Sequence, residues 1–169
     1  VTVVEYLKEC LPMLDSDIAK RLRKLMEKRG IAFYMGAGVK SIDGSSVLFE
    51  QKGKEVSVEA DYVLMATGRK PNTEGLNLEA AGISLAPNGT IPVDEHFRCI
   101  NGQWSMVNGQ CYAIGDVNGR QMLAHAAEMQ GIHVVNRILG IEDNIRFDIM
   151  PAAIFTNPEA ALVGPSEDQ

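Results

Sequence analysis

The sequence lacks several features that would point to particular classes of protein. No apolar run approaches the roughly 18 residues that a membrane-spanning helix needs. The three cysteines, Cys10, Cys99 and Cys111, form no Cys-x-x-Cys pair, and no Cys and His residues cluster at ligand spacing. These absences argue against a membrane-spanning protein, a disulfide framework and a metal site.

Positive charge is also scarce. The chain has 16 Lys and Arg residues against 22 Asp and Glu residues, which gives a formal net charge of −6. This balance argues against a protein that binds nucleic acid through phosphate contacts. Because cysteines are few and no secretory leader is recognised, we expect a reducing, cytoplasmic location.

What is present fits a globular protein with a sizeable core, since 46% of the residues are hydrophobic and 22% are charged. The chain opens on a β-branched run, Val1-Thr2-Val3-Val4, without an initiating Met, and it stops soon after another apolar run. We therefore expect an internal fragment of a longer protein, entered midway through a fold.

Apolar periodicity predicts an α/β pattern in the first part of the chain. A helix is expected from Asp15 or Ser16 to a stop at Gly30, with Ile18, Leu22, Leu25 and Met26 on its buried face. The predicted strands are 1–5, 31–34, 39–42, 47–49, 56–58 and 61–66. Turn residues between the three middle strands make them an antiparallel meander.

The second part of the chain is less regular. The sequence predicts a short helical piece at 78–82, short strands at 90–93 and 111–114, a polar loop or hairpin at 101–110, and a helix at 123–139. A final apolar stretch, 151–163, alternates poorly. We expect the open edges of strands 1–5 and 61–66 to close on each other, or stretch 151–163 of a second copy to fill the gap between them.

Glu5 ends an apolar strand that is followed by a loop and a helix. In a doubly wound sheet, an acidic residue in this place accepts hydrogen bonds from a ribose diol and repels the 2′-phosphate of NADP. The alternative is an ordinary strand end. The usual Gly-x-Gly-x-x-Gly loop, about 20 residues upstream, is absent from this chain.

Two further strand ends carry candidate residues. Gly68 would let a cofactor approach the backbone, with Arg69 near any anionic group, although a plain loop exit also favours glycine. Asp116 can accept a hydrogen bond from a sugar hydroxyl, and the helix start near His125 offers backbone N–H groups. The alternatives there are an aspartate that caps the helix and a structural histidine.

Together, these motifs resemble the flavin-dependent pyridine nucleotide–disulfide oxidoreductase family, class I. The motifs are V-T-V-V-E, A-T-G-R-K-P-N, A-I-G-D-V, M-L-A-H-A-A and F-T-N-P-E-A, and they cover nearly the whole chain. Within the family they are most similar to the dihydrolipoamide dehydrogenases. The resemblance implies an α/β fold, with a partial Rossmann-type NAD-binding domain, its antiparallel meander, and part of the FAD-binding, or central, domain.

The resemblance also implies domain boundaries, cofactors and partners. Residues 1–72 would be the C-terminal part of the NAD-binding domain, 73–149 the return segment of the central FAD domain, and 150–169 the start of the dimerisation domain. The implied cofactors are NAD and FAD, the latter not retained by this chain alone. The implied partners are a second copy, as a homodimer, and a lipoyl-bearing 2-oxo acid dehydrogenase or glycine cleavage complex.

The resemblance assigns cofactor contacts to eight residues. Glu5 would bind the adenosine ribose of NAD, Val39 would contact the adenine through its backbone, and Gly68 would lie beside the nicotinamide half. Asp116 would hold the ribityl chain of the flavin. The backbone segment against the flavin would comprise Met122, Leu123, Ala124 and His125.

The catalytic groups of the family have no match in this sequence. Its Cys-x-x-x-x-Cys redox pair is absent, and neither His96 nor His133 has a glutamate in the context of its acid/base pair. We therefore assign no catalytic residue and no metal ligand, and we expect the chain alone to be inactive. Two alternatives stay open: another disulfide reductase of the superfamily, mercuric or NADH-dependent, and a nucleotide-binding module without a redox role.

Overall fold

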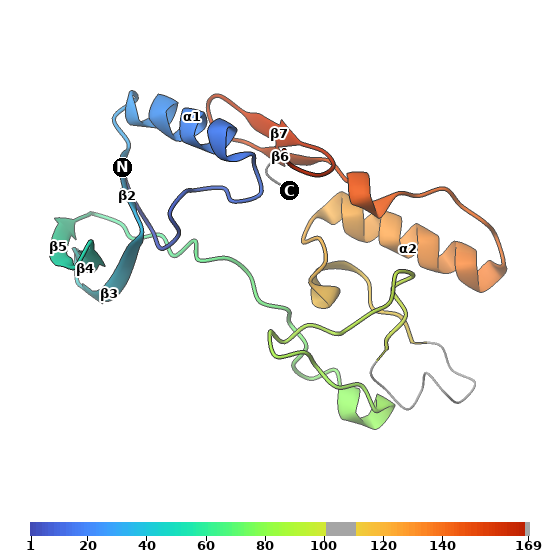
Figure 1. Cartoon of the computed structure of the whole chain (residues 1–169). Coiled ribbons are helices and arrows are strands. Elements are labelled where there is room, and N and C mark those ends of the chain that lie inside the picture. Colours follow the sequence, from blue (N-terminus) through green and yellow to red (C-terminus); the bar gives the residue numbers. More distant parts are fainter. Residues whose placement is uncertain (101–110, 168–169) are drawn as a thin grey trace. The chain divides into compact units, whose positions relative to one another are not determined.

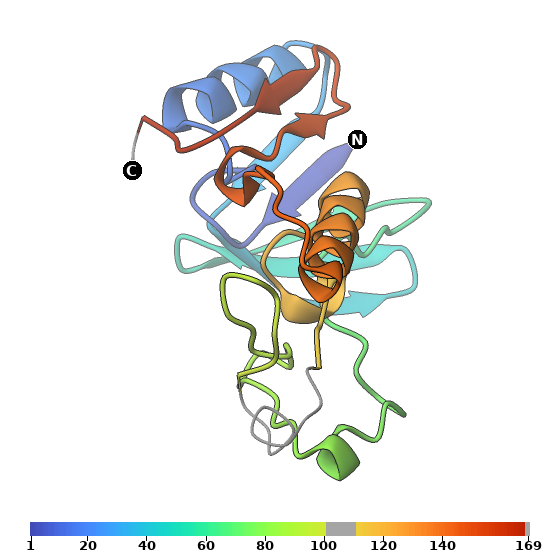
Figure 2. The same ribbon diagram turned by 90° about the vertical axis from the view of Figure 1, so that its right-hand side faces the viewer.

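The computed structural model describes residues 1–100 and 111–167, and it divides into two units (Figures 1 and 2). Unit 1 comprises Val1–Ala66 and Pro151–Gln169, and unit 2 comprises Thr67–Met150. The loop or hairpin predicted at 101–110 lies outside the described residues.

Unit 1 begins with a parallel pair of strands. Strands β1 (Thr2–Glu5) and β2 (Ala32–Met35) pair in register, with Val3 opposite Phe33. Helix α1 (Ser16–Glu27) provides the crossover that a parallel connection requires. The predicted strand–helix–strand order is confirmed.

The buried face of α1 differs in part from the predicted one. Leu22 is buried as expected, but Ala19 is buried as well, whereas Ile18 is 41% exposed. Ala19 and Leu22 form a core cluster with Leu14, and the small side chain of Ala19 allows a close approach by the neighbouring element.

That neighbouring element is the C-terminal stretch. Strands β6 (Ala152–Ile154) and β7 (Ala160–Leu162) form an antiparallel hairpin that packs on α1 (Figures 1 and 2). Beyond β7, the backbone N–H of Glu167 donates to Asp15 Oδ1 at 2.6 Å. Ile154, Ala160 and Leu162 of this stretch pack within its own unit, whereas Phe155 and Val163 are exposed. That the stretch fills a gap in a second copy stays a prediction.

The antiparallel meander is confirmed. It consists of β3 (Ala37–Asp43), β4 (Ser46–Gln51) and β5 (Lys54–Glu59), in that order across the sheet. Phe49 is fully buried at its core, and its ring meets that of Tyr34 edge to face at a centroid distance of 4.8 Å. The core of the meander therefore reaches β2.

The strand predicted at 61–66 does not form. The segment is irregular, with Tyr62 94% exposed and Leu64 88% exposed. Strands are stable only when a neighbour satisfies their backbone N–H and C=O groups, and none of the described strands pairs with this segment. The expected closure of its edge on β1 is therefore absent as well.

The described residues of unit 2 contain one long helix and short turns of 3-10 helix. The elements are η1 (Leu78–Ala81), η3 (Gly115–Asn118), α2 (Ala124–Leu139) and η4 (Phe147–Ile149). The predicted helical piece near 78–82 and the helix at 123–139 are confirmed. In the described part of the chain, no helix is both long and apolar enough to cross a membrane.

The strands predicted at 90–93 and 111–114 are wrong. Among residues 1–100 and 111–167, these segments form two isolated bridges, Val93 with Cys99 and Arg98 with Tyr112. A small core of Ile83, Ile91, Cys99 and Ala113 nevertheless forms beneath them. Single backbone hydrogen bonds between loops, such as Ala113 N–H to Phe97 O at 3.0 Å, replace the expected ladders.

Candidate functional site

Glu5 lies at the carboxyl end of β1, half-buried. Its Oε1 accepts a hydrogen bond from the backbone N–H of Leu7 at 2.8 Å, and Leu7 O accepts one from Gly36 N–H at 2.8 Å. The loop after β1 is thus bent back over the end of β2. A carboxylate is thereby held at the edge of a parallel pair where strand ends commonly meet ligands.

Val39 lies in the same unit, on β3, and its side chain is half-exposed. The pairing of β3 with β4 is irregular between Val39 and Ser41, which is a local bulge. At the neighbouring Gly38, an added Cβ would lie 3.8 Å from the Tyr6 ring. The loop that follows Glu5 and the start of β3 therefore lie close together.

Two cations of unit 1, Arg23 and Lys40, are engaged with carboxylates. Arg23 donates through Nε to Glu9 Oε1 and through a terminal nitrogen to Glu27 Oε1, each at 2.7 Å. The hydrogen bond from Arg23 lowers the pKa of the Glu9 carboxyl below its usual range. Lys40 Nζ lies 2.9 Å from Glu50 and 3.1 Å from Glu55. These four acids partly neutralise Arg23 and Lys40, which reduces the attraction of these two cations for a phosphate.

In unit 2, the structure brings together two of the sequence motifs. Arg69 donates to Asp116 Oδ2 at 3.2 Å, although the two residues are 47 positions apart. The preceding residue, Gly68, has φ +97°, and an added Cβ there would meet no atom within 4 Å. The backbone at Gly68 thus borders open space, in a conformation that favours glycine.

The turn that carries Asp116 is held by residues that sequence reasoning did not select. Gln130 Oε1 accepts hydrogen bonds from Gly115 N–H and from Asn118 Nδ2, both at 2.8 Å. Asn118 Nδ2 also donates to Ala113 O at 3.0 Å. Because 12 to 15 residues separate Gln130 from its partners, no short sequence pattern signals the network.

The segment 122–125 precedes and begins α2. Leu123 is the N-cap residue in extended conformation, and no side chain caps this end of the helix. Asp116 is therefore not the N-cap of α2, and that alternative is wrong. Ala124 and His125 are exposed in the first turn of α2.

The structure also joins two histidines that the sequence leaves apart. His96 Nδ1 lies 3.1 Å from His133 Nε2, and His133 Nδ1 lies 2.9 Å from Asp143 Oδ1. The hydrogen bond with His133 lowers the pKa of the Asp143 carboxyl. Glu95, adjacent to His96 in sequence, has Oε1 4.0 Å from His96 Nε2. The three hydrogen-bonded side chains tie α2 to the loops on either side of it.

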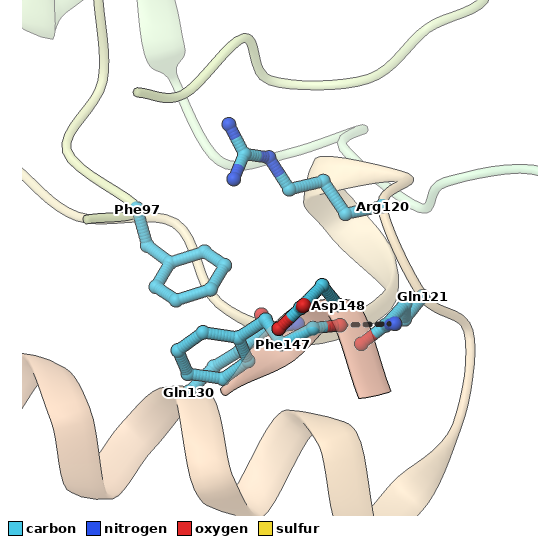
Figure 3. Close-up of a pocket in the computed structure, with 6 residues that line it drawn as sticks. All are labelled: Phe97, Arg120, Gln121, Gln130, Phe147 and Asp148. Carbon is cyan, nitrogen blue, oxygen red and sulfur yellow. Dashed lines mark hydrogen bonds between the residues drawn. The ribbon is translucent and has the colours of Figure 1, made fainter. Parts of the chain in front are cut away.

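A cavity of about 270 Å³ opens beside α2 in unit 2 (Figure 3). Gln121 Nε2 donates to Phe147 O at 2.9 Å, and the Arg120 guanidinium lies 5.5 Å from the centre of the Phe97 ring. The cavity contains none of the eight predicted residues, but it borders Gln130. Its lining comprises Phe97, Arg120, Gln121, Gln130, Phe147 and Asp148.

The three cysteines are free thiols. Burial and the neighbouring Cys111 raise the pKa of Cys99 to about 12. Cys99 is therefore protonated near neutral pH and is a poor nucleophile. In residues 1–100 and 111–167, no group of three His, Cys, Asp or Glu side chains is arranged to hold a metal ion.

A parallel β1–α1–β2 unit that continues into an antiparallel meander places the chain among α/β proteins with a Rossmann-type domain. The chain belongs to the pyridine nucleotide-disulphide oxidoreductase family, whose model matches residues 1–131. Both the fold class and the family expected from the sequence are confirmed.

Named relatives are similar over the whole chain. Dihydrolipoyl dehydrogenase 3 of Pseudomonas putida is 38% identical over 100% of this chain and 36% of its own length. Leghemoglobin reductase of Glycine max is 38% identical over 100% of this chain and 32% of its own length. The chain thus spans about a third of the length of these curated relatives.

Solved structures give a consistent result. LpdA from Mycobacterium tuberculosis matches with a TM-score of 0.81 and 34% identity, over 99% of this chain and 36% of that one. The HOCl-induced flavoprotein disulfide reductase RclA from Escherichia coli matches with a TM-score of 0.79 and 26% identity, over 100% of this chain and 38% of that one.

Proposed function

We propose that this chain forms the NAD-binding part, and one wall of the FAD site, of a dihydrolipoamide dehydrogenase. Such an enzyme oxidises dihydrolipoamide and reduces NAD through FAD and a redox disulfide. The observation that carries the proposal is the carboxylate of Glu5 at the carboxyl end of β1, in a parallel strand–helix–strand unit. The 38% identity to a protein named dihydrolipoyl dehydrogenase supports this choice within the family.

NAD is favoured over NADP by the charges around Glu5. The carboxylate would accept hydrogen bonds from the two ribose hydroxyls and would repel a 2′-phosphate. Arg23, a cation that could attract the phosphate, is held by Glu9 and Glu27. Val39 would contact the adenine through its backbone, and Gly68 would border the nicotinamide half.

The residues of unit 2 fit a flavin. Asp116 presents a half-exposed carboxylate that can accept a hydrogen bond from a ribityl hydroxyl, with Arg69 balancing its charge. The uncapped start of α2 offers backbone N–H groups to carbonyl oxygens of the ring, through Met122, Leu123, Ala124 and His125. When bound, FAD supplies the two-electron carrier, whereas this chain's residues bind and orient the cofactors.

The domain assignment belongs to the same proposal. Residues 1–72 would complete the NAD-binding domain, 73–149 would return to the FAD domain, and 150–169 would begin the dimerisation domain. A homodimer that serves a lipoyl-bearing complex in the cytoplasm is the corresponding assembly.

Two alternatives have specific support. The similarity to leghemoglobin reductase and to the RclA disulfide reductase favours a family member that reduces another substrate. A nucleotide-binding module without a redox role is the second alternative, and the residues that carry it are the same candidate NAD contacts, Glu5 and Val39. Turnover of dihydrolipoamide with NAD by the protein expressed from its complete reading frame separates the first proposal from both.

The ribose assignment is tested by Glu5→Gln in the same protein. Losing the charge-assisted bonds to the diol should lower kcat/KM for NAD by about 10- to 100-fold. The double variant Glu5→Ser/Tyr6→Arg should shift the NAD/NADP ratio of kcat/KM toward NADP, because Tyr6 is exposed beside the same loop. Glu59→Gln, an acid of the meander bonded to Ser45, is the matched control. An unchanged ratio in both Glu5 variants would refute the assignment.

A further inference from the structure

We propose that Gln130 is a positioning residue for flavin binding. It would set the conformation of the turn Gly115–Asn118 that presents Asp116, without itself touching the cofactor. This inference rests on the proposed function, in which Asp116 holds the ribityl chain.

The amide oxygen of Gln130 is fully committed to the turn. Gln130 is completely buried on α2, and its Oε1 accepts from Gly115 N–H at the start of the turn and from Asn118 Nδ2 at its end. An amide oxygen has two lone pairs, so both are used. Since the two partners are donors, flipping the amide would place N–H groups against N–H groups, and the orientation of Gln130 is fixed.

The turn needs this support because its backbone is irregular. Gly115 has φ +76° and follows Ile114 in extended conformation, so the N–H of Gly115 has no helical or strand partner. Asn118 closes the other end by donating to Ala113 O, and its own Oδ1 accepts from Arg120 N–H at 2.9 Å. Gln130 and Asn118 therefore fix both ends of the four residues that carry Asp116.

Packing against α2 limits how far the turn can relax. An added Cβ at Gly115 would lie 3.3 Å from the Cβ of Ala127, and one at Gly131 would lie 3.5 Å from Ile114 Cδ1. Small residues on this face of α2 let the turn approach closely enough for the glutamine to reach it. Because the turn and this face of α2 are in close contact, a change at Gln130 should shift the turn that carries Asp116.

The amide nitrogen of Gln130 also supports a role in positioning the turn. Gln130 Nε2 is buried without a hydrogen-bond partner, on the side of α2 that borders the cavity (Figure 3). An unpaired buried donor is destabilising, and a methionine of similar size would avoid it. What the glutamine adds over an apolar side chain is its accepting oxygen, which the turn uses.

The experiment measures the Kd for FAD of the protein expressed from its complete reading frame, by flavin absorbance and fluorescence after removal and return of FAD. Gln130→Met should raise the Kd for FAD by about 10- to 100-fold, since two hydrogen bonds to the turn are lost. Gln130→Glu keeps the accepting oxygen and should restore most of the affinity. The Kd for NAD should stay unchanged in both variants.

Val134→Ala is the matched control. Val134 is buried one turn further along α2 and makes no hydrogen bond to the turn. It should lower the unfolding midpoint as Gln130→Met does, yet leave the Kd for FAD unchanged. If Gln130→Met does not fold, Asn118→Leu cuts the same network from the other side and should weaken FAD binding in the same way.

The outcomes separate the two proposals. FAD binding by the wild type that Gln130→Met or Asn118→Leu leaves unchanged would overturn the role of Gln130 alone. An equal loss of FAD affinity in Val134→Ala would also overturn it, because general destabilisation would then explain the effect. A wild-type protein that binds no FAD would overturn the proposed function itself.

Discussion

The two units of the chain hold their candidate residues by different means. In unit 1, Glu5 and Val39 lie on strands whose position follows from regular pairing, β1 with β2 and β3 with β4. In unit 2, Asp116 lies on a short turn that polar side chains hold through their bonds to the backbone. Regular structure tolerates many sequences, whereas such a turn depends on individual polar residues.

The largest expected effect is on the core of unit 1. Phe49→Ala empties a fully buried ring site and should destabilise the meander by about 3–5 kcal/mol. Hydrogen exchange should show the loss of protection in unit 1 but not in unit 2. Phe155→Ala, in the same unit but 86% exposed, is the control and should change little. An equal loss of protection in unit 2 would show that the two units unfold together.

The second-largest effect is expected from removing a polar side chain of unit 2, that of Asp94. Asp94 accepts from the backbone N–H of His96 and Arg98, at 3.0 and 2.9 Å, and from the Arg98 side chain. Asp94→Ala should destabilise unit 2 by about 1–3 kcal/mol, measured by chemical unfolding. Asp94→Asn keeps an acceptor for the backbone and should cost less. A smaller loss for Asp94→Ala than for Asp94→Asn would contradict the view that side-chain bonds hold this unit.

The thiols provide a pH test. Because the folded pKa of Cys99, about 12, lies above its ordinary value of 9.0, ionisation favours the unfolded state. The stability of unit 2 should therefore be complete below pH 9 and should fall as the pH rises from 9 toward 12. Cys99→Ala should flatten this dependence of stability on pH.

Site-resolved alkylation at pH 8 should label Cys10, which is only partly buried, before Cys99. Faster labelling of Cys99 would contradict its placement in the core.

The smallest effect is expected at acid pH. The hydrogen bond from His133 lowers the pKa of Asp143 below its ordinary value of 3.8. The stabilisation from this carboxylate is therefore present above pH 3.8 and is lost as the pH falls through the lowered pKa. Asp143→Asn should reduce the acid sensitivity of unit 2 in pH-jump unfolding. An unchanged acid transition would show that the bond between His133 and Asp143 contributes no measurable stability.

The sequence-based predictions of secondary structure succeeded more often in unit 1 than in unit 2. The parallel pair, α1 and the meander were predictable because their apolar periodicity and turn residues act over short distances. The segments 61–66, 90–93 and 111–114 have equally apolar sequences but did not form strands. A strand needs a partner that satisfies its backbone, and local sequence carries no information about whether one is present.

In the candidate site, too, local sequence did not reveal which distant residues meet. Glu5, Gly68 and Asp116 were selected because each follows an apolar run, a local signal. The contact of Arg69 with Asp116 joins positions 47 apart in the chain, and that of His96 with His133 joins positions 37 apart. No local pattern distinguishes Gln130 from any other buried helical residue.

The sequence by itself determined the α/β class, the helices and the place of Glu5 at the end of β1, because helix and strand periodicity and turn chemistry are properties of neighbouring residues. Only the tertiary structure decided that the 151–163 stretch packs on α1, that 61–66 stays unpaired, and that Gln130 holds the turn of Asp116. Those outcomes depend on which distant groups meet, and on the need of each buried polar group for a partner.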